Sequence, residues 1–445
     1  SKDFTVSAQE TTFISRNLPA IRQDESYCWC PEDYKVQVSF DLQGTQFTPN
    51  EYKPYSQKWE DVDKQLLKPE NTQFGEHLSL TNPFRPETKQ AYNSEMNFEE
   101  KIICAFQVLK KKMAWNGRYQ LYSKELEKVI KKGSGSNADL NFILISILKD
   151  FGLEAYPVVM SRRSSGMLPY NFPSLQKLNT FFVAIHDINK QKYVFLDSSM
   201  DVPAFNILPL ELSVNKARML SLKEKEEKKW VNVMALSHNK SFMKIDARIE
   251  GNQVKGHRST VLYGQEAIEY QANENHKQDN LVSNPENKVS QKEKLTVTNL
   301  KVKKQENDWA LIEEEFDFVL QADRTDDHLY INPMLFPQLK SNPFIQTERV
   351  LPIEFPYPYK FTMLSTLTLP EGYEVEELPQ SQSIRSEGDG LQCKYMIQQQ
   401  GNTILLNYVF HLKGYIFLSE QYKQLQELWA KVIEKNNALI VLKKI

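Results

Sequence analysis

The stretch that decides the fold is "KKGSGSNADLNFILISILKDFGLEA", which runs from Lys131 to Ala155. A Gly-Ser-Gly entry precedes a long apolar run, and Gly152 follows it, so the pattern predicts a buried helix with a glycine stop. Ser136 followed three residues later by Asp139 is typical of a capping box, which satisfies the free N–H groups of the first helical turn. The predicted buried stripe consists of Leu140, Ile143, Leu144, Ile147 and Leu148.

A helix entered in this way is expected to present its N-terminus to a cleft. The helix dipole favours an anion there and lowers the pKa of a thiol placed at that end. This pattern is typical of an active-site helix, yet the segment contains no cysteine.

Length and composition limit the classes of protein that fit. A chain of 445 residues predicts two to four domains. A net charge of −2 argues against nucleic-acid binding, because no excess of Lys and Arg is available for phosphates. The sequence contains no run of about eighteen apolar residues, so no membrane span is predicted. With 20 Tyr, 24 Phe and more Pro than Gly, the composition favours β-sandwich material.

The periodicity divides the chain into four parts. Residues 1–42 are interpreted as the remnant of an N-terminal β domain, because "YKVQVSFDL" alternates at period two, and 43–90 as an exposed connector with one short helix at "KWEDVDKQLL". Residues 91–215 place three helices before three antiparallel strands, which predicts an α+β core. Residues 216–445 predict one or more β-rich domains that end in an amphipathic helix and a terminal strand.

Two hairpins are predicted in the β-rich part, in "MKIDARIEGNQVKGHRSTVLY" and "LQCKYMIQQQGNTILLNYVFHL", each with a Gly-Asn turn. Between them, 271–294 is polar and predicts a long loop or a surface helix. Cys28 and Cys30 are interpreted as strand residues and Cys104 as a buried small hydrophobe. Four cysteines are too few for a disulfide scaffold.

Three motifs of the core resemble the transglutaminase-like (papain-like) superfamily. "GSNAD" (Gly135–Asp139) lies where that family has Gly-x-Cys-x-Asp, and "GLEAYPV" (Gly152–Val158) lies at the end of its helix. "LNTFFVAIHDINKQKYVFLDSS" corresponds to the pair of strands that carry a His and an Asp. Residue by residue, Asn137 falls in the cysteine position, Thr180 in the histidine position and Asp197 in the aspartate position.

The resemblance implies a degenerate catalytic triad. In the family a thiolate attacks an acyl carbon, an imidazole moves the proton, and a carboxylate orients the imidazole. An amide cannot be that nucleophile, and a threonine hydroxyl cannot replace imidazole as the base. The sequence therefore predicts a pseudoenzyme, with no catalytic residues.

Neighbouring residues leave an active enzyme as the alternative. Ser134 and Ser136 supply hydroxyls at the helix mouth, but a serine nucleophile needs a base. His186 lies six residues beyond Thr180 on the same strand, which places it about 20 Å away at strand rise. His77 and His257 cannot be placed from the sequence.

Candidate ligand-binding residues are Ser136, Asp139, Arg162 and Arg163. The two arginines lie in "MSRRSSGMLPYNFPSLQK", which is expected to overhang the site like a lid and to bind an anionic group or to form a solvated loop. "NPFIQTERVLPIEFPYPY" has four prolines among aromatic residues. It predicts proline-fixed edge strands and turns, or alternatively a platform for a peptide or glycan.

The flanking segments extend the resemblance. "SNPFIQTERVLPIEFPYPYKF" (Ser341–Phe361) and "LPEGYEVEELPQSQSI" (Leu369–Ile384) resemble the C-terminal β domain of unknown function in multidomain transglutaminase-like proteins of Gram-negative gut bacteria. Such proteins are typically exported, so the resemblance implies a periplasmic or cell-envelope location, although the chain begins without a signal segment.

Three functions follow from these observations. The first is a non-catalytic binding or scaffold protein of the cell envelope, whose partner is a peptide, a glycan or an envelope protein. The second is an active acyl-transfer or peptidase enzyme with a serine nucleophile. The third is a purely structural envelope component. No cofactor and no metal site are expected, because no His, Cys and Asp cluster has ligand spacing.

Overall fold

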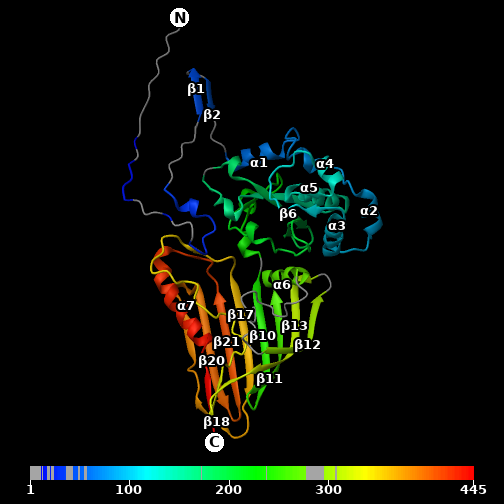
Figure 1. Ribbon diagram of the computed structural model, residues 1–445. Helices are drawn as coiled ribbons and strands as arrows, with labels where there is room; N and C mark the ends of the chain where they lie inside the picture. Colours follow the sequence, from blue (N-terminus) through cyan, green and yellow to red (C-terminus); the bar gives the residue numbers. More distant parts are fainter. Residues whose placement is uncertain are drawn as a thin grey trace.

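The computed structural model describes residues 12, 14–17, 21, 25–36, 44–48, 51–54, 58–171, 173–236, 238–276, 295–305 and 308–445. An α+β core of helices and a short sheet lies above a larger part built mainly of long strands (Figure 1). Most of the predicted N-terminal β remnant, including residues 37–42 of its strand, lies outside the described residues.

The core is organised around one buried helix. This helix, α5 (Asn137–Asp150), is covered on nearly all sides, because its residues are apolar around most of its circumference. The other helices of the core are α1 (Trp59–Leu67), α2 (Arg85–Ala91), α3 (Phe98–Lys112) and α4 (Leu126–Lys132). Gly152 adopts the left-handed conformation, with φ 74°, immediately after α5, as predicted for its stop.

A five-stranded sheet supports α5. Its order is β7 (Lys192–Leu196), β6 (Thr180–Asp187), β5 (Glu154–Met160), β8 (Ala217–Met219) and β9 (Trp230–Val231), all antiparallel. The three strands predicted from periodicity are β5, β6 and β7. One face packs on α5, and the apolar side chains of 204–236 cover the other, so β5 and β6 are buried on both faces.

The segment predicted as a connector contributes to this core. The hairpin β1 (Gly44–Thr48) and β2 (Glu51–Pro54) precedes α1, which is the predicted short helix. From α1 to α2 the chain is not simply exposed, because Val62, Leu66 and Phe74 are fully buried against the core helices. Asp63 on α1 forms a buried ion pair with Arg218 on β8, with Nε to Oδ1 at 2.6 Å, which fixes the helix to the sheet.

The β-rich part contains an eight-stranded sheet (Figure 1). Both predicted hairpins are present within it, as β10 with β11 and β20 with β21. A single parallel pair, β10 with β17, joins two antiparallel halves. The strands, in spatial order, are β12 (Leu295–Gln305), β13 (Asp308–Gln321), β11 (Gln253–Tyr263), β10 (Asn239–Glu250), β17 (Tyr359–Thr368), β21 (Thr403–Leu412), β20 (Leu391–Gln400) and β19 (Gln382–Arg385).

A second layer covers one face of this sheet. It consists of α7 (Tyr422–Asn436) and a four-stranded sheet, in the order β14 (Asp323–Arg324), β15 (His328–Ile331), β23 (Ile440–Lys444) and β18 (Tyr373–Glu377). Alternate residues of both sheets and the apolar face of α7 form one continuous core, so this part is of the β-sandwich type. Helix α6 (Gln265–His276) lies at the end of β10, β11 and β13 that faces the α+β core (Figure 1).

The cysteines, the proline-rich segment and the polar segment agree only in part with the predictions. Cys104 is buried on α3, as expected. Cys28 and Cys30 are not strand residues, because they lie in an irregular segment before the short 3₁₀ helix Pro31–Tyr34. In the proline-rich segment Ile353–Glu354 forms a short strand, β16, which pairs with β22 (Ile416–Phe417), and the last residue, Tyr359, begins β17. Of the polar segment 271–294, the structure describes only the part that belongs to α6.

Candidate functional site

The structure brings the three predicted triad positions together. Asn137 donates from Nδ2 to the hydroxyl oxygen of Thr180 at 2.8 Å, and the same nitrogen lies 3.4 Å from Oδ2 of Asp197. The three residues come from the first turn of α5, the first residue of β6 and the end of β7. The positions assigned from the resemblance are therefore neighbours in space, although they lie 43 and 60 residues apart in the chain.

The capping box that was predicted at the start of α5 is present. Ser136 donates from both its backbone nitrogen and its hydroxyl to Oδ2 of Asp139, at 2.8 and 2.7 Å, and its hydroxyl oxygen accepts from the backbone of residue 139 at 3.3 Å. Both residues are buried. Their polar atoms satisfy each other, so these two candidate binding residues cap the helix in this structure.

A second asparagine, Asn141, completes the polar cluster. It donates from Nδ2 to Oδ2 of Asp197 at 2.9 Å and to the carbonyl oxygen of Phe181 at 2.8 Å. Its own Oδ1 accepts from the backbone of Ser198 at 3.0 Å. The sequence interpretation missed this residue, although a polar side chain one turn after Asn137 in an apolar helix is a recognisable signal.

Asp197 is held by donors alone. Its Oδ2 faces the two asparagine amides, and its Oδ1 accepts from the backbone nitrogen of Ser199 at 2.9 Å and from that residue's hydroxyl. Burial raises the pKa of Asp197, and the hydrogen bonds from Ser199 and the two asparagines oppose that rise. Because every neighbour donates, the cluster is built for the carboxylate form.

The expected cleft at the N-terminus of α5 is closed, which corrects the prediction. The loop after β3 (Ala114–Trp115) covers the helix end and is fixed by parallel pairing with β4 (Ser134–Gly135). The backbone nitrogen of Asn137 donates to the carbonyl of Arg118 at 3.1 Å, and its Oδ1 accepts from the backbone of Gln120 at 2.9 Å. The exposed fractions of Asn137, Thr180 and Asp197 are 0%, 0% and 1%.

The polar groups at the start of α5 are bonded to neighbouring residues of the core. The side chain at the nucleophile position is an amide whose two polar atoms are already bonded. The helix N–H that would stabilise an oxyanion donates instead to Arg118. The hydroxyl of Ser136 is bonded to Asp139, and His186 lies at the far end of β6, where its Nδ1 is 3.4 Å from Glu154.

The other histidines raised as bases have partners elsewhere. Nε2 of His77 lies 3.0 Å from the carbonyl oxygen of Ser123. His257 is on β11, where its Nδ1 lies 2.8 Å from Oδ1 of Asp317. Among the described residues, none of these three histidines is hydrogen-bonded to Ser134 or Ser136.

The two arginines of the predicted lid have different surroundings. Arg163 donates to the carbonyl oxygens of Pro356 and Phe355 at 2.8 and 2.7 Å, and its guanidinium lies 4.2 Å from the ring centroid of Trp29. Arg162 is half-buried, with Nη1 3.8 Å from Glu211. The segment therefore binds the core to the β-rich part, and Arg163 uses its charge and its donors for that contact.

The chain near Trp29 completes this junction. The backbone and indole nitrogens of Trp29 donate to the side chain and carbonyl of Glu354, at 2.8 and 3.1 Å, and the hydroxyl of Tyr34 donates to the same carboxylate at 3.0 Å. Asp33 accepts from the backbone nitrogen of Met167 at 2.7 Å. The segment 25–36 thus touches both parts of the molecule, which the sequence alone did not indicate.

The proline-rich segment does not form an open aromatic platform at its centre. Phe344 and Phe355 are buried in the β-rich core, where both rings contact Trp429 at centroid distances of 5.3 and 5.6 Å. Those two rings are therefore not available to a ligand.

Among the described residues, no group of three His, Cys, Asp or Glu side chains is arranged to hold a metal ion. Within the same part of the chain, none of the helices combines the length and the hydropathy needed to cross a bilayer.

Comparison with known proteins supports the fold. A family model described as a domain of unknown function with a solved structure (DUF3858) matches residues 327–442, and no curated protein matches the chain. The structure resembles a crystal structure from Parabacteroides distasonis ATCC 8503 described as a "putative protease", with a TM-score of 0.50 and 12% identity over 83% of this chain and 57% of that one. The chain thus spans little more than half the length of that relative. The likeness concerns the fold alone, and it confirms the predicted α+β class with a papain-like core beside β-sandwich-type material.

Proposed function

We propose that this chain is a transglutaminase-like protein with a degenerate triad, and that it acts as a non-catalytic binding or scaffold protein. The observation that carries the proposal is the closed cluster around Asn137. Its amide is bonded on both sides, and its backbone nitrogen donates to Arg118. A substrate acyl group has neither a nucleophile nor an oxyanion site to meet there.

The test is a direct assay of the purified chain for acyl transfer and hydrolysis. N-acyl-glutamine donors with an amine acceptor, and a panel of unlabelled peptides, cover the two reactions that the fold supports elsewhere. We expect no turnover above that of the Asn137→Ala variant. Turnover that disappears in Ser136→Ala and persists in Ser134→Ala would replace this proposal with a serine enzyme, because only Ser136 lies at the helix cap.

A purely structural role is the second candidate, and the closed cleft favours it over binding in the cleft itself. Both roles use the core as a rigid block that Arg163 and Trp29 fix to the β-rich part. They differ in whether a ligand binds elsewhere on the molecule. Saturable binding of a peptide or glycan would separate them in favour of the binding role.

We also propose a cell-envelope location. The support is the resemblance of the core and the flanking β segments to exported multidomain proteins. Fractionation of cells that carry the native gene, with an antibody against the chain, tests it. Recovery in the soluble cytoplasmic fraction would refute the location and leave the non-catalytic role untouched.

A further inference from the structure

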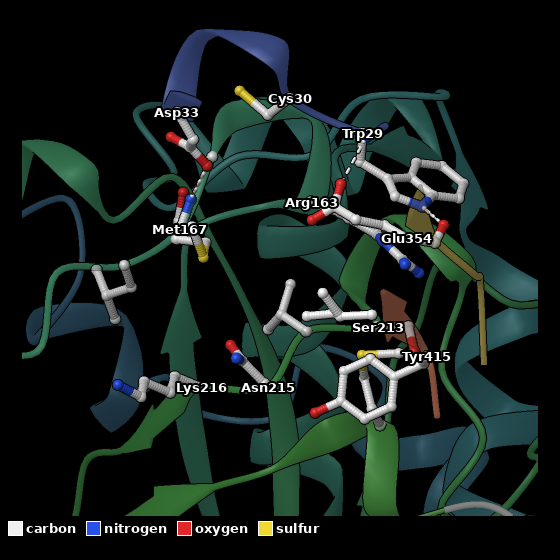
Figure 2. A pocket seen from close by; sticks show the side chains of 16 residues that line it. Trp29, Cys30, Asp33, Arg163, Met167, Ser213, Asn215, Lys216, Glu354 and Tyr415 are labelled. Atoms are coloured by element: carbon white, nitrogen blue, oxygen red, sulfur yellow. Dashed lines mark hydrogen bonds between the residues drawn. The ribbon is translucent and has the colours of Figure 1, made fainter. Parts of the chain in front are cut away.

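A pocket lies where the α+β core meets the β-rich part, and its lining does not include Asn137, Thr180 or Asp197. We call it the junction pocket, and it is lined by Trp29, Ser161, Met167, Asn215, Lys216 and Tyr415, among others. Figure 2 shows Trp29 in the segment 25–36, Met167 in the chain after β5, Asn215 and Lys216 before β8, and Tyr415 before β22, all around this pocket. Clefts between parts of a protein are common sites for small ligands.

The pocket has an inner end and an open mouth. Ser161, Leu168 and Met234 line it and are buried, whereas Met167 and Lys216 line it and are exposed. Its volume of about 50 Å³ is room for roughly three or four water molecules, or for a group of a few heavy atoms. The pocket therefore suits one end of a ligand.

Several polar side chains in the lining have no partner within the part of the chain that the structure describes. The hydroxyl of Ser161 is buried and makes no hydrogen bond, and that residue is 2% exposed. The side chains of Asn215 and Tyr415 also lack hydrogen bonds to the described residues. Ser161 is the buried one of the three, whereas Asn215 and Tyr415 are half-buried. Because buried polar groups are normally satisfied, the unbonded Ser161 hydroxyl points to a ligand or to ordered water, and the other two side chains add polar groups around the same cavity.

The charges of the lining select the chemistry of that ligand. Asp33 accepts from Met167, Glu354 accepts from Trp29 and Tyr34, and Arg163 is bonded to carbonyl oxygens. Among the charged lining residues in the described ranges, Lys216 alone makes neither a hydrogen bond nor an ion pair. Its Nζ lies 4.9 Å from the ring centroid of Tyr170. An unpaired cation beside neutral donors favours an anion.

Lys216 is exposed at the mouth of the pocket, so an anion bound by its ammonium group would lie at the mouth. In Figure 2, Lys216, Asn215 and Tyr415 lie on the side of the pocket opposite Asp33, Cys30 and Trp29. The anion is therefore kept apart from the Asp33 carboxylate. Planar carboxylates match amide, hydroxyl and ammonium donors that approach from different directions.

We propose that the junction pocket binds the carboxylate of a small acid or of a peptide C-terminus. Lys216 and Asn215 bind the carboxylate near the mouth, and the stem of the ligand extends past Met167 towards Ser161. This inference rests on the proposed non-catalytic binding role and gives it a site. It assigns anion binding to Lys216, whereas the sequence suggested Arg162 and Arg163 for that role.

The experiment uses matched pairs of probes that differ in charge and hardly in shape. Butanoate is compared with butanamide, and N-acetylglycine with N-acetylglycinamide, by ligand-observed and protein-observed NMR titration of the full chain. We expect saturable binding of the two acids and at least tenfold weaker binding of the two amides. Binding of butanoate alone identifies a small acid as the source of the carboxylate, and tighter binding of N-acetylglycine identifies a peptide terminus.

Variants assign the site. Lys216→Met is expected to weaken acid binding at least tenfold and Lys216→Arg to keep most of it, while Lys192→Met, which changes an exposed lysine on β7, is expected to have no effect. Unchanged thermal unfolding of Lys216→Met establishes that the fold is intact. Equal binding of acid and amide, equal binding by Lys216→Met, or no saturable binding of any probe would each overturn the proposal.

Failure of the pocket proposal can be distinguished from failure of the proposed non-catalytic function. Absence of binding together with absence of turnover removes the pocket assignment and leaves a non-catalytic protein. Turnover in the acyl-transfer assay removes the non-catalytic role, whatever the pocket binds.

Discussion

At the scale of single residues, Asn137 connects several separate segments of the core. Here the amide links α5 to β6 through Thr180, to Asp197 at the end of β7, and to the loop after β3 through Gln120. The side chain of Asn137 therefore holds four segments of the core together.

Removing the side chain of Asn137 is expected to destabilise the protein. In Asn137→Ala the backbone nitrogen of Gln120 loses its acceptor and the site loses two donors, in a region with no access to water. We expect a loss of about 2–4 kcal/mol in the free energy of unfolding, measured with urea. The control Asn189→Ala changes an exposed turn residue and is expected to stay within about 0.5 kcal/mol. A loss below 1 kcal/mol for Asn137→Ala would show that the cluster contributes little.

A charge at the same position is expected to give a pH-dependent effect. Asn137→Asp places a second carboxyl beside Oδ2 of Asp197, which is now 3.4 Å from the amide nitrogen. Two buried carboxylates cannot both ionise without a large cost, so the pair binds a proton more tightly in the folded state. The variant should therefore be least stable above neutrality and should recover towards pH 5, in unfolding curves at several pH values. The absence of that recovery would argue against close contact between the two carboxyls.

At the scale of elements, local pattern predicted a good part of the fold. The alternation in β10, β11, β20 and β21, with a Gly-Asn pair between partners, allowed both hairpins to be placed. The apolar run and the Gly152 stop defined α5. These elements are recognisable because their signals lie within a dozen or so residues of each other.

The contacts that decide function were not predictable in this way. Closure of the cleft depends on Arg118 and Gln120 reaching back to Asn137 from an irregular loop with no periodic signal. The contact between Trp29 and Glu354 spans 325 residues. Such pairings are set by tertiary packing. The sequence therefore suggested that the Arg163 guanidinium could bind an anion, whereas in the structure it donates hydrogen bonds to backbone carbonyl oxygens.

The lid segment provides a prediction at this scale. Arg163→Ala removes two hydrogen bonds to the carbonyls of Phe355 and Pro356 and the contact with the Trp29 ring. We expect a loss of about 2–3 kcal/mol and faster limited proteolysis between the core and the β-rich part. Arg162→Ala is the matched control, because its pair with Glu211 is long and partly exposed and is expected to contribute under 1 kcal/mol. Equal effects of the two substitutions would contradict the assignment of Arg163 as the junction residue.

At the scale of the whole molecule, α6 lies between the two parts and carries a titratable group. The hydroxyls of Tyr359 and Ser241 hydrogen-bond the carboxyl of Glu266, and burial, together with the nearby Glu269, raises the pKa of Glu266 to about 7. Tyr357 also lies close to both carboxyls. The helix is therefore attached to β10 and β17 through a group whose charge changes near neutral pH.

The sign of the pH effect follows from this raised pKa. The folded state binds the proton of Glu266 more tightly than the unfolded state does. The stabilisation from this protonation is therefore complete below about pH 4.5 and is lost as the pH rises through about 7. Glu266→Gln should remove this dependence and be more stable than the wild type at pH 8, by on the order of 2 kcal/mol. Thermal unfolding midpoints across this pH range provide the measurement. Glu250→Gln on the exposed end of β10 is the control, and parallel pH profiles for Glu266→Gln and the wild type would refute the assignment.

The parallel pair of β10 and β17 has a consequence for any attempt to study the matched family region by itself. That region, residues 327–442, begins after β13, so a fragment with these bounds contains β17 without β10. Ten residues of β17 would then present an unpaired row of backbone donors and acceptors next to buried side chains such as Phe361 and Met363. Such a fragment is expected to self-associate through this bare edge. A separately supplied segment spanning β10 and β11 should suppress the oligomers by taking the vacant place.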